Sequence, residues 1–215
     1  PTITSVGIDY ATGIITIAFS ETINLDQVDQ TQMYIGDSSS DDDIVLTNCV
    51  EQGDQNVKKR TSIALKLLES ERVASLRLSA MAPNGNGGAV VLNIKAAAFQ
   101  DYALNDNLLS SGIAVTETAD TTPPTITSVT LDSNDGTLQI TASETLDSND
   151  LNFIVLSDMS LSANTHTTVP LSGDVSFGDA TLVTSTSADG TLVIDITLNH
   201  KQRAATVAMY LDSTI

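Results

Sequence analysis

The first 22 residues of this chain, PTITSVGIDYATGIITIAFSET, recur in altered form as PTITSVTLDSNDGTLQITASET, which begins at Pro124. The two segments align without a gap, and 12 of the 22 aligned positions are identical. Chance similarity between two β-rich segments does not keep register over such a length, so the chain contains an internal repeat. For 215 residues, this repeat predicts two domains, at residues 1–120 and 121–215.

Each copy of the repeat has the pattern of a β-hairpin. Apolar residues alternate with polar ones over residues 2–9 and again over residues 14–20, which predicts a strand and its return strand. The turn of the second copy ends in Asp135-Gly136, a strong hairpin signal. Further strands are predicted over residues 32–35, 44–50, 62–67, 76–80, 90–98 and 113–118. Many short strands without a long helical period predict an all-β chain of two β-sandwiches.

One charged segment in each copy breaks the strand pattern. LESERVASLR in the first copy has helical spacing, and LNHKQRAATV takes the corresponding place in the second, with Arg203 at the position of Arg72. We expect a short helical turn in each domain, with its charged residues on a solvated face.

The copies differ in length after this segment. From Arg72 the first copy continues for 48 residues to Asp120, whereas 12 residues follow Arg203. The second sandwich is therefore predicted to lack its last strands, which correspond to VVLNIKAAAF and IAVTET. We interpret the chain as a window on a longer protein; the alternative is that a neighbouring chain supplies a strand.

The linker over residues 120–124 reads DTTPP. Its two prolines favour an extended, stiff path, so the two domains are expected to form a semi-rigid rod.

The charge of the chain restricts its partners. With 27 acidic against 9 basic residues, the formal net charge is −18, which disfavours nucleic acid and anionic membrane surfaces and suits calcium. No apolar run approaches the roughly 20 residues of a membrane span, so no membrane insertion of this segment is expected. Cys49 is the single cysteine and lies in an alternating apolar segment, which predicts a buried thiol.

Three motifs carry a resemblance to a known family: TPPTITSV, the strand end Phe19-Ser20-Glu21, and the later FQDYALN at residues 99–105. The chain resembles the tandem Ig-like repeats, bacterial Ig-like or cadherin-like, of large bacterial or algal cell-surface, adhesin and extracellular filament proteins. The second copy departs from the pattern, because Ala142 replaces the phenylalanine and the Asp/Asn element is absent. Such repeats serve as stalks, adhesin shafts, surface-layer subunits and surface filaments, including flagellar hairs.

Acidic residues at the ends of the domains suggest a cadherin-like calcium site. Carboxylates from a strand end, a linker and a late loop could together supply the six to eight oxygens that calcium prefers. The predicted interdomain ligands are Asp120, Glu144, Asp147 and Asp150, and Glu21 and Asp101 would form the equivalent junction with a preceding domain. The alternative is that Glu21 and Glu144 accept backbone hydrogen bonds and cap turns.

Other chemistry finds little support in the sequence. Asp41, Asp42 and Asp43 could bind a cation or mineral surface, but the usual behaviour of charge runs favours a solvated loop. Lys66 and Lys95 are interpreted as lysines on wet strand faces, with an isopeptide crosslink as the alternative. His166 and His200 stand in polar contexts, no hydrolase or phosphate-loop motif occurs, and tryptophan is absent, so we expect no enzyme.

These observations predict a structural, non-catalytic segment of an extracellular, repetitive surface protein that forms a rod or filament. Its partners would be other copies of itself or neighbouring repeats of a longer chain. One alternative is an adhesin module that binds a cell-surface glycan or protein. Another is a pair of accessory domains of a secreted enzyme.

Overall fold

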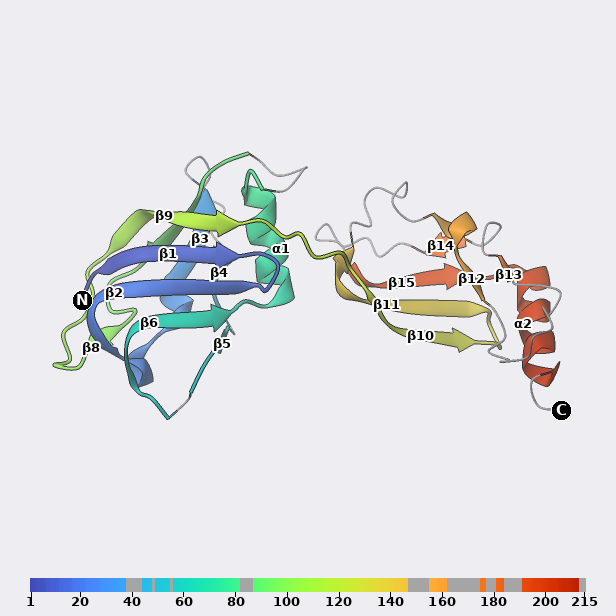
Figure 1. Ribbon diagram of the computed structural model, residues 1–215, viewed down its shortest axis with the longest axis horizontal. Helices are drawn as coiled ribbons and strands as arrows, with labels where there is room; N and C mark the ends of the chain where they lie inside the picture. The colour runs from blue at the N-terminus through green and yellow to red at the C-terminus, as the bar shows by residue number, and fades with distance from the viewer. Residues whose placement is uncertain are drawn as a thin grey trace. The chain divides into compact units, whose positions relative to one another are not determined.

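The computed structural model describes residues 1–37, 44–47, 49–54, 56–81, 87–146, 155–161, 175–176, 181–183 and 191–212 (Figure 1). Over these residues the chain is mostly β-strand. It divides into two compact units, Pro1–Thr122 and Pro123–Ile215, which are described separately below.

The repeated segment forms a hairpin at the start of the first unit. Strand β1 (Ile3–Asp9) pairs antiparallel with β2 (Ile14–Asn24). The turn between them needs a left-handed residue, and Gly13 supplies it with φ of 66°. Asp9 stabilises the same turn, because its Oδ1 accepts a hydrogen bond from the Ala11 backbone N–H at 3.0 Å. The sequence prediction of this hairpin is confirmed.

The remaining strands extend the hairpin into one curled sheet. They are β3 (Met33–Asp37), β4 (Ile44–Val45), β5 (Val50–Glu51), β6 (Lys59–Lys66), β7 (Val90–Ile94), β8 (Gln100–Asp101) and β9 (Ser110–Thr118). Their order is β4-β3-β7-β9-β1-β2-β6-β5, with β8 pairing onto β2. In Figure 1, β3 and β4 lie behind β1 and β2, so the sheet folds back over itself and encloses the core. Short 3-10 turns at Leu25–Gln27 and Gln30–Gln32 carry the chain from β2 to β3.

The core of this unit is aliphatic with a central aromatic pair. Inward-facing positions of the strands supply the buried residues, among them Ile15, Ile17, Ile35, Ile63 and Leu92. The rings of Phe19 and Phe99 meet edge-on, with centroids 4.7 Å apart. Phe19 and Phe99 come from two of the three motifs on which the resemblance was based, so this contact explains both aromatic positions by packing.

The first and last strands of the unit lie side by side in the same direction. β1 pairs parallel with β9 through Val6–Val115, Gly7–Thr116, Ile8–Glu117 and Asp9–Thr118. β9 also pairs antiparallel with β7, as expected from the sequence. Strand β9 therefore joins the hairpin half of the sheet to the half that contains β3 and β7.

Two predicted strands are wrong in detail. Residues 76–80 do not form a strand, because helix α1 (Glu69–Leu78) extends to Leu78 and Ser79 makes only an isolated bridge with Gly88. The helix buries Glu71, Ser75 and Leu78 at helical spacing. The single strand expected over residues 44–50 is replaced by β4, which pairs with β3, and β5, which pairs with β6. The two ends of that segment thus join different parts of the curled sheet.

The second unit contains β10 (Ile126–Asp132), β11 (Thr137–Leu146), β14 (Thr181–Val183) and β15 (Thr191–Thr197), paired in the order β10-β11-β15-β14. A separate pair joins β12 (Ser160–Leu161) and β13 (Val175–Ser176), next to a 3-10 turn at Leu156–Asp158. Helix α2 (His200–Asp212) follows β15. The apolar core of the second unit is formed by the buried residues Leu138, Ile140, Ile194, Ile196 and Leu198.

The hairpin of the second unit reproduces that of the first residue for residue. Val129 pairs with Ile140 as Val6 pairs with Ile17, and both hairpins have a register shift near their first residue. Gly136 has φ of 83° at the place of Gly13. The order β10-β11-β15-β14 matches β1-β2-β6-β5, so this half of the curled sheet is built twice.

Candidate functional site

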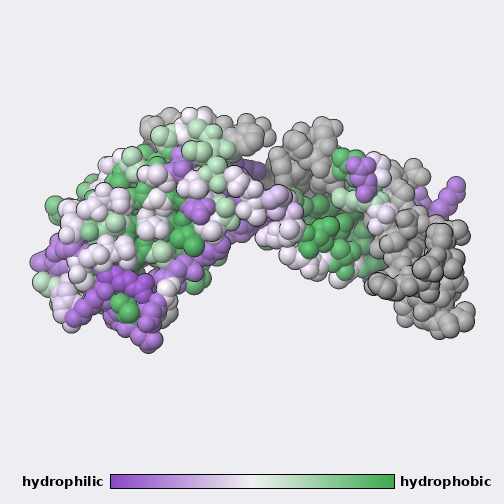
Figure 2. Space-filling view, viewed as in Figure 1, coloured by the Kyte–Doolittle hydropathy of each residue, from purple (hydrophilic) through white to green (hydrophobic). Residues whose placement is uncertain are grey.

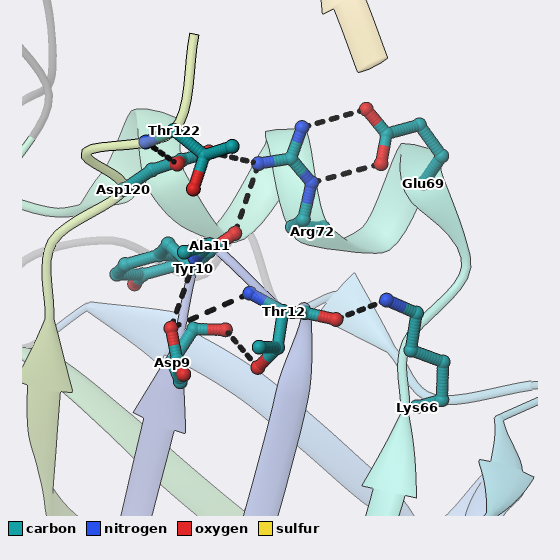
Figure 3. Close-up of polar contacts among 9 residues, drawn as sticks. All are labelled: Asp9, Tyr10, Ala11, Thr12, Lys66, Glu69, Arg72, Asp120 and Thr122. Carbon is teal, nitrogen blue, oxygen red and sulfur yellow. Dashed lines mark hydrogen bonds and ion pairs between the residues drawn. The ribbon is translucent and has the colours of Figure 1, made fainter. Parts of the chain in front are cut away.

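The guanidinium of Arg72, on helix α1, connects three separate segments of the first unit. Its Nη1 donates to the Tyr10 backbone oxygen at 3.0 Å and to Asp120 Oδ2 at 2.8 Å. Its Nε and Nη2 donate to the two carboxylate oxygens of Glu69 at 2.8 and 2.7 Å. Figure 3 shows the guanidinium between these groups. We call Tyr10, Glu69, Arg72 and Asp120 the Arg72 cluster.

The turn of the first hairpin makes room for the Arg72 side chain. A Cβ atom at Gly13 would lie in tight contact with Arg72 Cδ, at 3.2 Å, so glycine is favoured there by space as well as by φ. On the other side of the turn, Lys66 Nζ donates to the Thr12 backbone oxygen (Figure 3). The hairpin turn is thus held between a strand and a helix that come from later in the sequence.

The Arg72 cluster corrects the expectation of a solvated charged face. Arg72 and Glu71 are 7% and 6% exposed. The helix turns both residues toward the sheet, where each charge finds partners, which is the condition for burying a charge. The sequence showed only the local helical spacing of the charged residues. It did not show that Asp120, 48 residues from Arg72, would be its partner.

Asp120 connects the Arg72 cluster to the segment that follows β9. Besides its ion pair with Arg72, its Oδ1 accepts a hydrogen bond from the Thr122 backbone N–H at 2.9 Å (Figure 3). The cluster therefore ties together the hairpin turn, helix α1 and the chain leaving the last strand. Chemically it is an electrostatic brace, because every group in it is held by a charge-assisted or backbone hydrogen bond.

The second unit repeats part of this brace. Arg203, on α2, donates from Nε to the Ser133 backbone oxygen at 2.8 Å and from Nη2 to the Asn134 backbone oxygen. A Cβ at Gly136 would lie 3.2 Å from Arg203 Cδ. The correspondence of Arg72 and Arg203 inferred from sequence is therefore matched by the same contact of an arginine with a hairpin turn.

Tyr10 forms a second connection beside the cluster. Its hydroxyl donates to Glu117 Oε1 on β9 at 2.7 Å, and the side chain is completely buried. Burial raises the pKa of Tyr10, and the Glu117 carboxylate raises it further. The neutral hydroxyl therefore remains a hydrogen-bond donor that links the end of β1 to β9.

A buried carboxylate, Glu71, organises the start of α1. Its Oε2 accepts from the Leu68 backbone N–H at 3.0 Å and from Cys49 Sγ at 3.3 Å. Its Oε1 accepts from the Thr47 backbone N–H at 2.9 Å. The carboxylate thus caps the helix and fixes the segment between β4 and β5.

The Cys49 thiol is predicted to resist modification in the folded protein. Burial and the neighbouring Glu71 carboxylate raise the pKa of Cys49 to about 12. At pH 8 the thiolate, which is the reactive form, is therefore scarce. A chromogenic disulfide reagent should react slowly with the native chain and rapidly in urea. Equal rates in the two conditions would contradict this burial.

The raised pKa of Cys49 makes the free energy of unfolding depend on pH. Above the pKa of an unfolded cysteine, about 8.5, the unfolded chain loses the proton that the folded chain retains. Stability from this group is therefore complete below that pH and falls as the pH rises toward 12. Cys49→Ala should remove the part of the stability loss at alkaline pH that comes from this thiol.

The predicted calcium ligands Glu21 and Asp101 lie on paired strands: Asp101, on β8, pairs with Ile23 of β2, two residues from Glu21. Glu21 forms an ion pair with the N-terminal ammonium at 3.0 Å. Asp101 accepts hydrogen bonds from the Asn105 side chain at 2.7 Å and its backbone N–H at 2.9 Å, and these bonds hold the pKa of Asp101 below its usual range. Asp101 thus closes the loop of the FQDYALN motif.

The predicted interdomain ligands are divided between the two units. Asp120 belongs to the first unit and is bound to Arg72, whereas Glu144 belongs to β11 of the second. Asp147 and Asp150 lie outside the described residues, as do Asp41, Asp42, Asp43 and His166. Among the residues that are described, no group of three or more acidic, histidine or cysteine side chains could hold a metal ion. Interdomain calcium remains a prediction.

Lys66, at the end of β6, and Lys95, directly after β7, are solvent-exposed, as interpreted from the sequence. Lys66 Nζ binds the hairpin turn, and Lys95 Nζ donates to the Tyr34 hydroxyl and lies 4.3 Å from the centre of that ring. These contacts do not support an isopeptide crosslink, which requires a buried lysine beside an amide or acid. His200 is exposed at the first position of α2.

No helix within the described ranges is long and apolar enough to cross a membrane.

Comparisons with known proteins add little to this description. No protein-family model matches the chain, and no curated protein matches it. Among solved structures, a thermostable esterase is similar over 64% of this chain and 42% of its own, with 10% identity and a TM-score of 0.36. The N-terminal part of the bacterial S-layer protein SbsC is similar over 66% of this chain and 30% of its own, with 11% identity and a TM-score of 0.35. Because both TM-scores lie below 0.5, neither likeness carries an argument about fold or function.

Proposed function

We propose that this chain is a non-catalytic, load-bearing segment of an extracellular protein built from tandem Ig-like β-sandwich units. The observation that carries the proposal is the parallel pairing of β1 with β9, the first and last strands of the first unit. The chain enters that unit at the start of β1 and leaves it at the end of β9 (Figure 1).

Tension applied through the chain would pull these two neighbouring strands in opposite directions along their own axes. The hydrogen bonds of the ladder run across that direction, so they share the load and must break together. Bonds loaded from one end of a ladder break one after another at lower force. A unit whose terminal strands are parallel and adjacent is therefore suited to transmit tension.

Two further contacts support the β1–β9 ladder at the end where the chain leaves. The Tyr10 backbone N–H donates to the Thr118 oxygen at 3.1 Å, and the Tyr10 hydroxyl binds Glu117. Beyond the ladder, Arg72 holds Asp120 to α1 and to the hairpin turn. A load arriving at Asp120 is thus distributed over the helix and the hairpin as well as over β9.

The repetitive and extracellular parts of the proposal rest on the sequence. A repeat that builds the same hairpin register twice favours an architecture made by adding units. The net charge of −18 keeps such a surface hydrated and favours neither nucleic acid nor anionic membrane as a partner. We propose neighbouring repeats and further copies of the chain as its partners.

Single-molecule pulling tests this function directly. With handles at Thr2→Cys and Thr122→Cys in a Cys49→Ala background, we expect the first unit to unfold in one cooperative event at high force. Arg72→Ala should lower that force, because the end of β9 then loses its attachment to α1. A unit that extends gradually at low force would overturn the load-bearing function.

A further inference from the structure

A glycine stands in the middle of strand β1 although its own unit does not require one. Gly7 pairs with Thr16 of β2 on one side and with Thr116 of β9 on the other. Its φ lies outside the left-handed region, and a Cβ atom there would meet only the Thr116 backbone oxygen, at 3.6 Å. The second copy of the hairpin carries Thr130 at the same position. Neither backbone conformation nor packing within the unit therefore explains Gly7.

Glycine weakens a strand interior, because it loses more chain entropy on folding than other residues and offers no side chain to pack. Strand glycines commonly mark a bulge, a tight bend, or a place where another molecule approaches the backbone closely. Gly7 interrupts neither of its ladders, since the register is regular from Ser5 to Asp9 against β2 and from Val6 to Asp9 against β9. We therefore take the close approach of another surface as the reason for this glycine.

The surface above Gly7 is a shallow groove of about 380 Å³. Ile14 and Thr16 of β2 line it on one side of β1. Thr116 and Thr118 of β9 line it on the other side. Figure 1 views this side of the sheet, with β9, β1, β2 and β6 next to one another. Because both edges of β1 are already paired, an occupant of the groove must make its contacts through side chains and cannot extend the sheet.

The chemistry of the groove suits an uncharged surface of small side chains. Threonine methyl and hydroxyl groups and isoleucine dominate the described lining, in which no residue is aromatic or basic, so a stacked sugar ring or an anion is disfavoured. The one lining carboxylate, Asp9, already accepts a hydrogen bond from the Ala11 backbone N–H. Beyond the groove, the next outward residues on β6 are also small, Ser62 and Ala64. Figure 2 shows surface of intermediate hydropathy over these strands.

We propose that this face binds the same face of a second copy of the chain, with a row of small side chains from each copy seated in the groove over Gly7 of the other. Neighbouring strands lie about 4.8 Å apart, so the rows on β2 and β9 flank a gap that is one row wide. The face itself provides a row that fits such a gap, Thr16 with Ala18 on β2. Ridge and groove are therefore complementary within one surface, as a two-fold contact between identical faces requires.

The charge of the chain also favours a contact through this face. With a net charge of −18, two copies repel one another through most of their surfaces. Between the rows of Ser5 and Asp9, the outward charges on β9, β1, β2 and β6 are Asp9 and Lys66, which have opposite signs. Two copies that meet here thus bring together faces without net charge.

The size of the face indicates a weak contact that gains strength by repetition. Four strands with three outward rows cover roughly 400 Å² on each copy, about half of what a standard interface buries on each partner. The inference deepens the proposed function and rests on it for its purpose, since a filament of load-bearing units needs lateral contacts between copies. Its test applies no force, so the lateral contact and the load-bearing role can fail separately.

The test follows the isotope-labelled chain of residues 1–215 by NMR from micromolar to millimolar concentration. We expect the signals of Gly7, Thr16 and Thr116 to shift with concentration. A nitroxide at Val50→Cys, in a Cys49→Ala background, should broaden the same signals in a second, labelled copy, because Val50 is 61% exposed and shares an outward row with Lys66. Signals that do not change with concentration, or broadening confined to other faces, would overturn the proposal.

Gly7→Thr introduces the residue of the second copy and fills the groove. It should weaken self-association by about tenfold or more, because the added atoms occupy the space of the partner's side chains. At low concentration it should leave the midpoint of urea unfolding of the first unit unchanged or raise it, since threonine suits a strand better than glycine. Thr130→Ala, at the equivalent position of β10, is the matched control and should leave self-association unchanged.

Three results with these variants would contradict the proposal. Undiminished self-association of Gly7→Thr would show that the groove is not the contact. A lower unfolding midpoint of Gly7→Thr would show that the unit itself requires the glycine. Binding of a neutral oligosaccharide such as maltohexaose, lost in Gly7→Thr and found in a chain that does not self-associate, would assign the groove to a glycan instead of a second copy.

Discussion

Arg72→Ala is expected to destabilise the first unit by about 3 kcal/mol or more, the usual cost of breaking a buried ion pair from one side. The substitution leaves Asp120, whose side chain is 14% exposed, without its cationic partner. It also removes a donor from the Tyr10 backbone oxygen and both ion-pair bonds of Glu69. Hydrogen exchange measured in urea on peptides from the first unit reports this loss separately from the second unit.

An exposed ion pair provides the control for this prediction. Lys58 and Asp26 lie 3.1 Å apart, with side chains 51% and 58% exposed. Lys58→Ala should therefore cost less than about 1 kcal/mol. A double-mutant cycle of Arg72→Ala with Asp120→Ala should show a coupling of about 1 kcal/mol or more, as expected for directly paired groups. If Arg72→Ala costs no more than Lys58→Ala, the cluster does not brace the unit.

Phe99→Ala is the second substitution with a large expected effect, about 3–5 kcal/mol on the unfolding of the first unit. The ring is 1% exposed and contacts Phe19 edge-on. Its backbone is fixed as well, because Phe99 N donates to Asn107 Oδ1 at 3.0 Å and the loop cannot easily collapse into the space. The midpoint of urea unfolding, read from peptides of the first unit, measures the loss.

Tyr102→Ala is the matched control, since Tyr102 is an aromatic residue in the same loop with 61% exposure. Its ring contacts Lys59 Nζ at 3.6 Å, a cation–π pair worth about 0.5–1 kcal/mol at an exposed site. The two substitutions should therefore differ by several-fold. Similar losses for both would mean that Phe99 is not part of the packed core.

The parts of the fold that were predictable are those with local signals. The hairpin follows from alternation and from glycine at the turn, and its second occurrence follows from sequence identity alone. The antiparallel relation of the last two long strands was also inferred correctly. The buried state of Cys49 followed from the apolar pattern around it and is confirmed.

The Arg72 cluster was not predictable in the same way. Glu69 and Arg72 have the spacing of a helical ion pair, which by itself is typical of a solvated surface. The residue that changes this interpretation is Asp120, which folding brings to Arg72 from the far end of the unit. A usable signal was present in the alignment, because Arg203 occupies the place of Arg72 in a segment where most other residues changed.

For the acidic residues, the positions could be predicted from the sequence but the binding partners could not. Glu21 and Asp101 were placed close together from the topology, and the structure brings them to neighbouring positions on β2 and β8. In the structure, Asp101 accepts hydrogen bonds from Asn105 within its own loop, whereas Glu21 forms an ion pair with the ammonium of Pro1. The carboxylates alone did not reveal these partners, since an acidic residue serves a loop or a metal with the same oxygens.

The central claim is that the parallel pairing of β1 with β9 bears tension. The most direct measurement compares two pulling geometries that share a handle at Thr122→Cys, in a Cys49→Ala background. One places the second handle at Thr2→Cys, just before β1, and the other at Thr12→Cys, in the turn that follows β1. The β1–β9 ladder is then sheared in the first geometry and opened from one end in the second. We predict a clearly higher rupture force for the Thr2→Cys handle; an equal or lower force would contradict the account.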